Sequence, residues 1–137
     1  MDQQSTIRLV ESYYDAFNRH DLEPFLALLT EDVCHDVNQG DREIGKTAFR
    51  AFMRRLYLLY QEKVEVSVIM STPDGSRAAA EYVARGTYQT SEDRMPEAKG
   101  QPYRIEGGAF FEVRDGFISR VTNYYNLEEW VRQVTDG

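Results

Sequence analysis

The short apolar segment at residues 33–37 contains a carboxylate whose setting could support chemistry. Asp36 stands near the end of this segment, and turn-forming residues follow directly at 38–41. A carboxylate beside an apolar pocket is a useful general base, because desolvation raises its pKa towards neutrality. The alternative is structural: Asp36 caps the turn or keeps the end of a strand in solvent.

His35 precedes Asp36 and is a second titratable group, with an ordinary pKa near neutrality. In a strand, neighbouring side chains point to opposite faces, so His35 and Asp36 would not work as a pair. His35 is therefore an alternative pocket base. His20 falls at the expected end of a helix and is assigned to solvent.

Further polar candidates lie on the later strands. Asn123 and Tyr125 share one face of the expected last strand with an apolar companion, Val121, which favours an inward orientation. Facing inward, Asn123 offers a ligand both a donor and an acceptor; facing outward, it is a solvated amide. Arg104 and Glu106 alternate on one strand face and are interpreted as a solvated ion pair, with an ion pair in the pocket as the alternative.

The apolar spacing predicts helices first and strands afterwards. A first helix covers residues 5–19, a second, apolar helix follows Asp21, and a third follows Gly45. The period then changes to alternation, which is typical of strands. Strands are expected at residues 33–37, 64–70, 78–88, 103–113 and 117–125, and an amphipathic helix closes the chain with Leu127, Trp130, Val131 and Val134.

This order predicts an α+β fold with the N-terminal helices packed on a strongly curved antiparallel sheet. Such a cone encloses an internal pocket. The polar stretch at residues 89–102 contains two prolines and is expected to be a long, mobile loop. Gly107 and Gly108, inside a strand pattern, are expected to mark a bulge or a bend.

Composition limits the kind of protein. The chain has 137 residues with 42% hydrophobic residues, which predicts one folded domain over residues 1–137. A net charge of −7 argues against nucleic-acid binding, and no stretch is long and apolar enough to span a membrane. The single cysteine, Cys34, and the polar N-terminus favour the cytoplasm. No metal-binding or nucleotide-binding spacing is present, so neither a metal nor a cofactor is expected.

Three stretches of the sequence resemble a known superfamily. They are VESYYDAFNRHDL near the start, EDVCHDVNQG with Gly45 after it, and AFFEVRDGFISRVTNYYN near the end. With the order of elements, they resemble the nuclear-transport-factor-like superfamily, in the branch of the ketosteroid isomerases and the SnoaL-like polyketide cyclases. The resemblance covers nearly the whole chain and is more specific for the fold than for the reaction.

The resemblance implies roles for individual residues. Tyr13 falls at the place of the tyrosine that holds the oxyanion, and Asp36 at the place of the general base, although the chain is one residue shorter before Asp36 than the usual pattern. Ala109 stands where the isomerases carry a second, protonated acid, and Met53 where they carry a further tyrosine. Asn123 stands where related epoxide hydrolases carry an aspartate, which argues against epoxide hydrolysis.

The resulting hypothesis is a cofactor-independent isomerase or cyclase that moves a proton on a hydrophobic carbonyl compound. Asp36 is the predicted base and Tyr13 the predicted oxyanion donor. A binding module for a small apolar ligand and a dimerising scaffold remain the alternatives, since the acid is missing at Ala109. The predicted ligand-binding residues are Phe17, Phe52, Met53, Ala109, Asn123 and Tyr125.

The sheet has a second face that the helices cannot cover. On one possible phase of the strands, this face carries Tyr82, Tyr88 and Phe110. An aromatic sheet face of this kind is expected to be covered by a partner. The resemblance also implies dimers, so a homodimer packed sheet to sheet is predicted.

Overall fold

Four helices and six strands make up the chain in the computed structural model, which describes residues 1–136. The helices are α1 (Gln3–Arg19), α2 (Leu22–Leu26), α3 (Lys46–Leu59) and α4 (Leu127–Asp136). Asp2 caps α1 by accepting a hydrogen bond from the Ser5 backbone N–H at 2.8 Å, and His20 ends it in the left-handed conformation with φ of 56°. The predicted three N-terminal helices and closing helix are confirmed.

The strands form one sheet in the order β2-β1-β6-β5-β4-β3. They are β1 (Leu29–Asp36), β2 (Arg42–Ile44), β3 (Tyr60–Ser71), β4 (Arg77–Tyr88), β5 (Gln101–Arg114) and β6 (Phe117–Tyr125). The predicted α+β class is confirmed. The sheet is mixed, however, because β1 pairs with β6 in parallel, so the prediction of a purely antiparallel sheet was wrong.

Two local predictions also differ from the structure. The second helix stops at Leu26, because Leu29 already belongs to β1 and packs in the core. The strand β2 was not predicted, since its sequence is short and charged. Its pairing with β1 nevertheless fixes Asp36 opposite Arg42 and His35 opposite Glu43.

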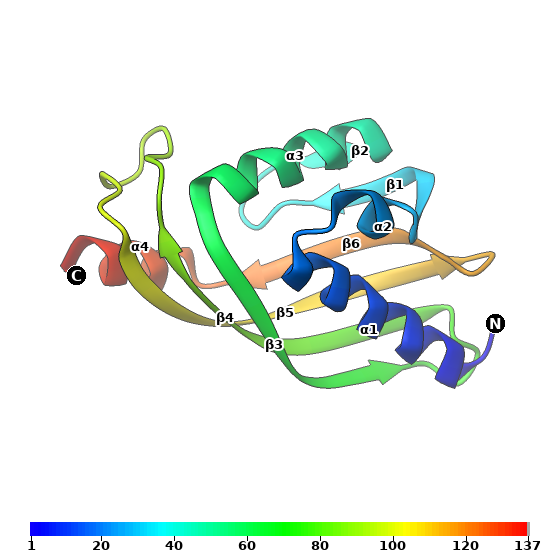
Figure 1. Cartoon of the computed structure of the whole chain (residues 1–137). Helices are drawn as coiled ribbons and strands as arrows, with labels where there is room; N and C mark the ends of the chain where they lie inside the picture. The colour runs from blue at the N-terminus through cyan, green and yellow to red at the C-terminus, as the bar shows by residue number, and fades with distance from the viewer. Residues whose placement is uncertain (137) are drawn as a thin grey trace.

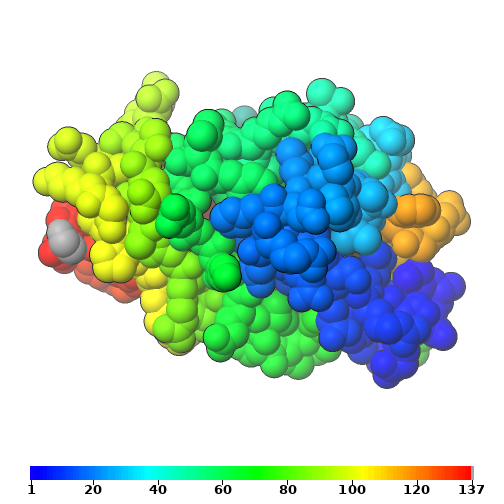
Figure 2. Space-filling model, viewed as in Figure 1, coloured from blue at the N-terminus to red at the C-terminus, as the bar shows by residue number. Residues whose placement is uncertain are grey.

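The helices α1, α2 and α3 all lie over one face of the sheet, as Figure 1 shows. In the space-filling view of Figure 2 the three helices occupy much of the front, and β3, β4 and the loop after β4 form its lower and left part. The main core lies between these layers and contains Val10, Phe25, Phe49 and Phe111. No helix among residues 1–136 is long and apolar enough to cross a membrane.

A second apolar cluster lies at the end of the sheet that packs against α4. It consists of Tyr88, Tyr103, Ile105, Trp130 and Val134. The loop between β4 and β5 packs against this cluster through Met95 and Ala98. The Tyr88 hydroxyl donates to the Pro96 carbonyl at 2.7 Å and accepts from the Glu92 backbone N–H at 2.8 Å. The loop expected to be mobile is therefore tied to the sheet by several contacts.

Candidate functional site

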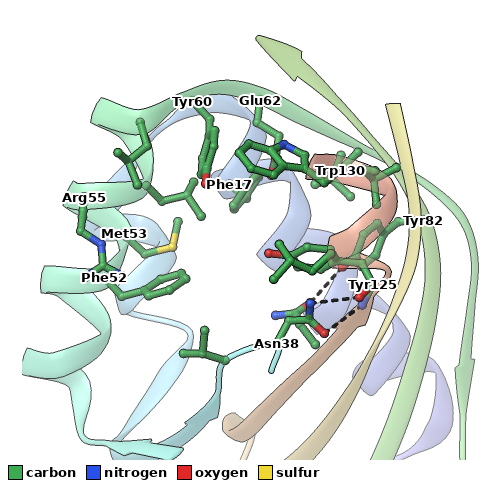
Figure 3. Close-up of a pocket in the computed structure, with 18 of the residues that line it drawn as sticks. Phe17, Asn38, Phe52, Met53, Arg55, Tyr60, Glu62, Tyr82, Tyr125 and Trp130 are labelled. Atoms are coloured by element: carbon green, nitrogen blue, oxygen red, sulfur yellow. Dashed lines mark hydrogen bonds between the residues drawn. The ribbon is translucent and has the colours of Figure 1, made fainter. Parts of the chain in front are cut away.

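A cavity of about 310 Å³ lies between α1, α3 and the inner face of the sheet. In Figure 3, Phe52, Met53 and Arg55 of α3 face Tyr82 and Tyr125 of the sheet across this space. Six of the predicted site residues line it: Tyr13, Phe17, Phe52, Met53, Asn123 and Tyr125. The lining combines apolar side chains with several phenols, which suits a small, largely apolar molecule.

Asp36, the predicted base, does not line the cavity. It accepts two hydrogen bonds from the Arg42 guanidinium, at 2.6 and 3.0 Å, and one from the Thr122 hydroxyl at 2.5 Å. The bonds from Arg42 outweigh desolvation and lower the pKa of Asp36 to about 2. The prediction that Asp36 faces the cavity with few donors around it was wrong.

The physical reason is the alternation of side chains along β1. His35 and Val33 are buried on the inner face, so Asp36 must point to the outer face. The segment is one residue shorter than the related pattern, and a shift of one residue exchanges the two faces of a strand. His35 therefore lines the cavity in place of Asp36.

Ala109, also predicted to bind ligand, lies beneath the cavity wall rather than on it. It is only 1% exposed and belongs to the main core. The prediction that Ala109 contacts the ligand was wrong. Asn123 on β6, which is paired with Ala109 in the sheet, lines the cavity instead.

Tyr13 lies deep in the cavity wall. Its ring packs against Tyr14, Phe25 and Phe111, with centroids 5.1, 4.7 and 5.3 Å away. Burial raises the pKa of Tyr13 well above its ordinary value, so the phenol keeps its proton at neutral pH. Such a phenol can donate a hydrogen bond to an oxygen but cannot act as a base.

Glu62 of β3 is a carboxylate that does line the cavity, as does Glu92 of the loop between β4 and β5. Desolvation raises the pKa of Glu62 to about 6, and a hydrogen bond from the Tyr103 hydroxyl at 2.7 Å opposes the rise. A carboxylate with a pKa near neutrality can both accept and return a proton at physiological pH. Among the residues described, Glu62 thus has the property that was expected of Asp36.

The Tyr103–Glu62 contact crosses an intervening strand at a glycine. Glu62 lies opposite Gly86 of β4, and Gly86 lies opposite Tyr103 of β5. A Cβ atom at Gly86 would stand 2.7 Å from the Tyr103 hydroxyl and would also collide with the Gln61 carbonyl. The missing side chain at Gly86 therefore lets the phenol reach the carboxylate.

A second phenol crosses the sheet in the same manner. The Tyr82 hydroxyl of β4 donates to Asn123 Oδ1 of β6 at 3.2 Å. A Cβ atom at Gly107, on the strand between them, would lie 2.9 Å from the Tyr82 ring. Gly107 and Gly108 pair regularly with both neighbouring strands, and the register between β5 and β6 shifts only later, between Glu112 and Val113, where Ser119 of β6 is the extra residue. Of the two expected alternatives, a bulge or a bend, the glycines do not form the bulge; Gly107 makes room for Tyr82.

The end of the cavity next to α4 is more polar. The Tyr60 hydroxyl donates to Glu92 at 2.6 Å, and both residues line the cavity together with Trp130. Asn38 exchanges two hydrogen bonds with the backbone of Tyr125, at 3.0 and 3.1 Å. Burial raises the pKa of Tyr125 to about 12. Figure 3 shows Tyr60, Glu62 and Trp130 gathered at this end.

The sequence contains a pattern that indicates an inward orientation of Glu62. Glu62 continues the alternation of Val64 and Val66 backwards by one step, and it shares their face of β3. The expected strand began at Val64, which left Glu62 outside it. No group of three or more His, Cys, Asp and Glu side chains among residues 1–136 is arranged to hold a metal ion.

Comparison with protein families identifies the chain. The model of the SnoaL-like domain matches residues 10–121. The chain belongs to the SnoaL-like family. This assignment confirms the resemblance to the nuclear-transport-factor-like superfamily, whereas no curated protein matches the sequence.

Solved structures of similar proteins cover the whole domain. A "putative polyketide cyclase" of Xanthomonas campestris pv. campestris is 50% identical, with a TM-score of 0.94 over 98% of this chain and 99% of that one. A protein of the same description from Pseudomonas putida KT2440 is 50% identical, with a TM-score of 0.92 over 94% and 97%. A "putative ketosteroid isomerase" of Kribbella flavida is 28% identical, with a TM-score of 0.70 over 90% and 79%.

Proposed function

We propose that this SnoaL-like protein is a cofactor-independent isomerase or cyclase that transfers a proton on a small hydrophobic carbonyl compound. The observation that carries the proposal is Glu62, a cavity-lining carboxylate whose pKa is raised to about 6. Most of the Glu62 side chains are ionised at neutral pH, yet they remain more basic than an ordinary carboxylate.

The reaction begins when Glu62 removes a proton from the carbon beside the carbonyl group. The electrons of that C–H bond move into a new C=C bond, and the carbonyl oxygen takes on negative charge. A phenol of the wall, for which Tyr13 is the candidate, donates a hydrogen bond to this oxygen. A phenol with an ordinary pKa is already protonated at neutral pH, and burial raises the pKa of Tyr13 further.

The enolate then has two possible outcomes. In an isomerase, the protonated Glu62 returns its proton to a different carbon of the same molecule. In a cyclase, the enolate carbon attacks a second carbonyl group of the substrate, and the oxygen of that group takes the proton from the protonated Glu62. Both reactions conserve atoms and electrons without a cofactor. The names of the two 50% identical relatives favour the cyclase.

Hydrogen exchange on a model ketone tests the proposal. A bicyclic ketone such as 2-tetralone is incubated with the protein in D₂O, and loss of the α-proton signal is followed by NMR. Glu62→Gln keeps the shape and the acceptor for Tyr103, and it is expected to slow the catalysed exchange by about 10²–10⁴. Glu65→Gln, on the exposed side of the same strand, is the matched control. Equal exchange by folded Glu62→Gln and parent would overturn the assignment of the base.

A binding module for a small apolar ligand is the second candidate function. It is favoured by Ala109, which stands in the core where the isomerases carry an acid. A binding module would take up the ketone without exchanging its protons. Calorimetry beside the exchange experiment therefore separates the two functions.

We also propose a homodimer packed sheet to sheet. The face of the sheet away from the helices exposes Val68, Met70, Phe110 and Tyr124, between 41% and 60% each. The rings of Phe110 and Tyr124 lie 5.9 Å apart and form a continuous apolar surface. Tyr82 and Tyr88, expected on this face, are instead buried on the inner side, so the predicted phase of β4 was wrong.

A further inference from the structure

His35 occupies an unusual place for a titratable side chain. It is 3% exposed and lines the cavity from the end of β1. Its ring is stacked on Phe49 with centroids 4.1 Å apart, and it meets the edge of Phe52 at 4.6 Å. The two phenylalanines hold the imidazole in one plane, so the directions of its nitrogen atoms are fixed.

One nitrogen of this ring faces a carboxylate. Nδ1 of His35 lies 3.6 Å from Oε1 of Glu43, the residue paired with it on β2. Both atoms are buried, and neither has a hydrogen-bond partner within residues 1–136. The distance is longer than a hydrogen bond, but a carboxylate at this position favours the tautomer that carries its proton on Nδ1.

The other nitrogen is then an acceptor. The two nitrogens lie on different sides of an imidazole, so Nε2 is the one that a molecule in the cavity can reach. With the proton on Nδ1, Nε2 presents a lone pair. The phenols of the wall carry donor hydrogens, whereas this nitrogen can only accept.

The surroundings keep His35 neutral. Burial lowers the pKa of His35 to about 4, although the charge of Asp36 on the far face opposes this. At neutral pH the group that faces the cavity is therefore an uncharged imidazole and not an imidazolium.

We infer that His35 selects ligands that carry a hydroxyl or N–H group, by accepting a hydrogen bond at Nε2, and that Glu43 positions the ring for this. The inference deepens the proposed function, because it rests on the cavity being a ligand site and names a feature of the ligand. A hydrophobic ketone that also bears a phenolic or enolic hydroxyl group fits both ends of the site. Glu62 acts on its C–H bond, and His35 holds its hydroxyl.

Two matched probes test the selection. 2-Naphthol carries a hydroxyl donor, and 2-methoxynaphthalene has the same rings without it. The parent is expected to bind 2-naphthol about fivefold to tenfold more tightly, which corresponds to one neutral hydrogen bond. His35→Phe keeps the stacking on Phe49 and should bind both probes equally. Persistence of the preference in His35→Phe, or failure of the parent to bind either probe, overturns the inference.

A control distinguishes this inference from the proposal for Glu62, which could also accept a hydroxyl. Glutamine at position 62 would keep an oxygen that can accept a hydroxyl, so Glu62→Leu is the control variant here, and it should retain the preference for 2-naphthol. Loss of the preference in folded Glu62→Leu would assign the acceptor to Glu62 and overturn the role of His35. Loss of exchange by Glu62→Gln with no preference in the parent would leave the catalytic proposal standing and remove only this inference.

The positioning role of Glu43 has its own readout. Long-range ¹H–¹⁵N NMR reports which imidazole nitrogen is protonated, and the parent is expected to show Nδ1–H. In Glu43→Gln the amide can also donate to Nδ1, so the Nε2–H tautomer should gain population and the preference for 2-naphthol should fall. A parent with Nε2–H as its main tautomer, or an unchanged tautomer in Glu43→Gln, contradicts the positioning role.

Discussion

The two faces of the sheet shift the pKa of a carboxylate in opposite directions. On the outer face, Asp36 is held by Arg42 and Thr122, and its pKa falls to about 2. On the inner face, Glu62 has one phenol for a partner in a desolvated wall, and its pKa rises to about 6. The difference shows that the number of donors and the access of water decide the chemistry of a carboxylate, whatever its place in a motif.

The comparison extends from single groups to whole surfaces. The inner face pairs its polar groups with phenols inside an apolar cavity, which favours binding and proton transfer. The outer face has its charges in exposed ion pairs, such as Arg77 with Glu112 at 3.0 Å, beside bare apolar side chains. Such a face suits another protein surface better than a small molecule.

The largest expected effect concerns the outer face. Phe110→Asp places a charge at the centre of the proposed sheet-to-sheet contact. Loss of a central aromatic anchor costs about 2–4 kcal/mol, so the dimer dissociation constant should rise at least about thirtyfold. Sedimentation over a concentration series measures it. Leu58→Asp, at an even more exposed apolar position on α3 (71% against 48% for Phe110), is the control and should not change assembly. A parent that sediments only as a 15.9 kDa species at micromolar concentration contradicts the dimer.

Asp36→Asn tests the structural role of the outer carboxylate. The folded pKa of about 2 lies below the ordinary 3.8, so the ionised form stabilises the fold above pH 3.8, and this contribution is lost as the pH falls through 2. Because Arg42 is about half exposed, solvent screens part of the interaction. The variant is expected to be about 1–2 kcal/mol less stable at pH 7, and the difference should disappear near pH 2. Thermal or urea melts at several pH values measure it; equal stability at pH 7 would show that Asp36 is dispensable.

The two carboxylates also show how far the sequence predicts the site. Alternation along the last strand placed Asn123 and Tyr125 inside correctly, because regular pairing keeps the phase of a strand. The phase of β1 was not predictable from the family pattern, because one missing residue exchanges His35 and Asp36 between faces. Local spacing does not reveal such a change; the pairing with β2 and β6 does.

The missed start of β3 has a different cause. The helix α3 ends at Leu59 and β3 begins at Tyr60, with no glycine or proline between them to mark the boundary. The apolar stripe of the helix therefore extends to Tyr60 in the sequence, and Glu62 lies between the expected end of the helix and the expected start of the strand at Val64. Later in the strand, an irregularity between Val66 and Val68 turns Val68 and Met70 to the outer face. Bulges of this kind depend on the partner strand and leave no clear mark in a single sequence.

Glu62→Gln should give the opposite response to Asp36→Asn. The folded pKa of Glu62, about 6, is raised above the ordinary 4.5, so the fold disfavours the charged form. This part of the stability is present below pH 4.5 and is lost as the pH rises through 6. Glutamine carries no charge, so the variant is expected to be as stable as the parent or about 1 kcal/mol more stable at pH 7. Melts of Glu65→Gln provide the control, and a destabilised Glu62→Gln at pH 7 would indicate a structural carboxylate like Asp36.

The smallest effect isolates the single donor that Glu62 retains. The Tyr103 hydroxyl stabilises the ionised carboxylate and so holds its pKa below the value that desolvation alone would produce. Tyr103→Phe removes this donor and keeps the ring against Trp130. The pKa of Glu62 should therefore rise from about 6 by less than one unit, because one hydrogen bond contributes about 1 kcal/mol. A ¹³C NMR titration of the Glu62 carboxyl measures this pKa, and the rise of exchange activity with pH should shift by the same amount.

The control is Tyr82→Phe, which removes the phenol that donates to Asn123 and should leave this titration of Glu62 unchanged. If the pKa of Glu62 falls in Tyr103→Phe, water has entered the space left by the hydroxyl, and access of water rather than the number of donors controls the inner carboxylate.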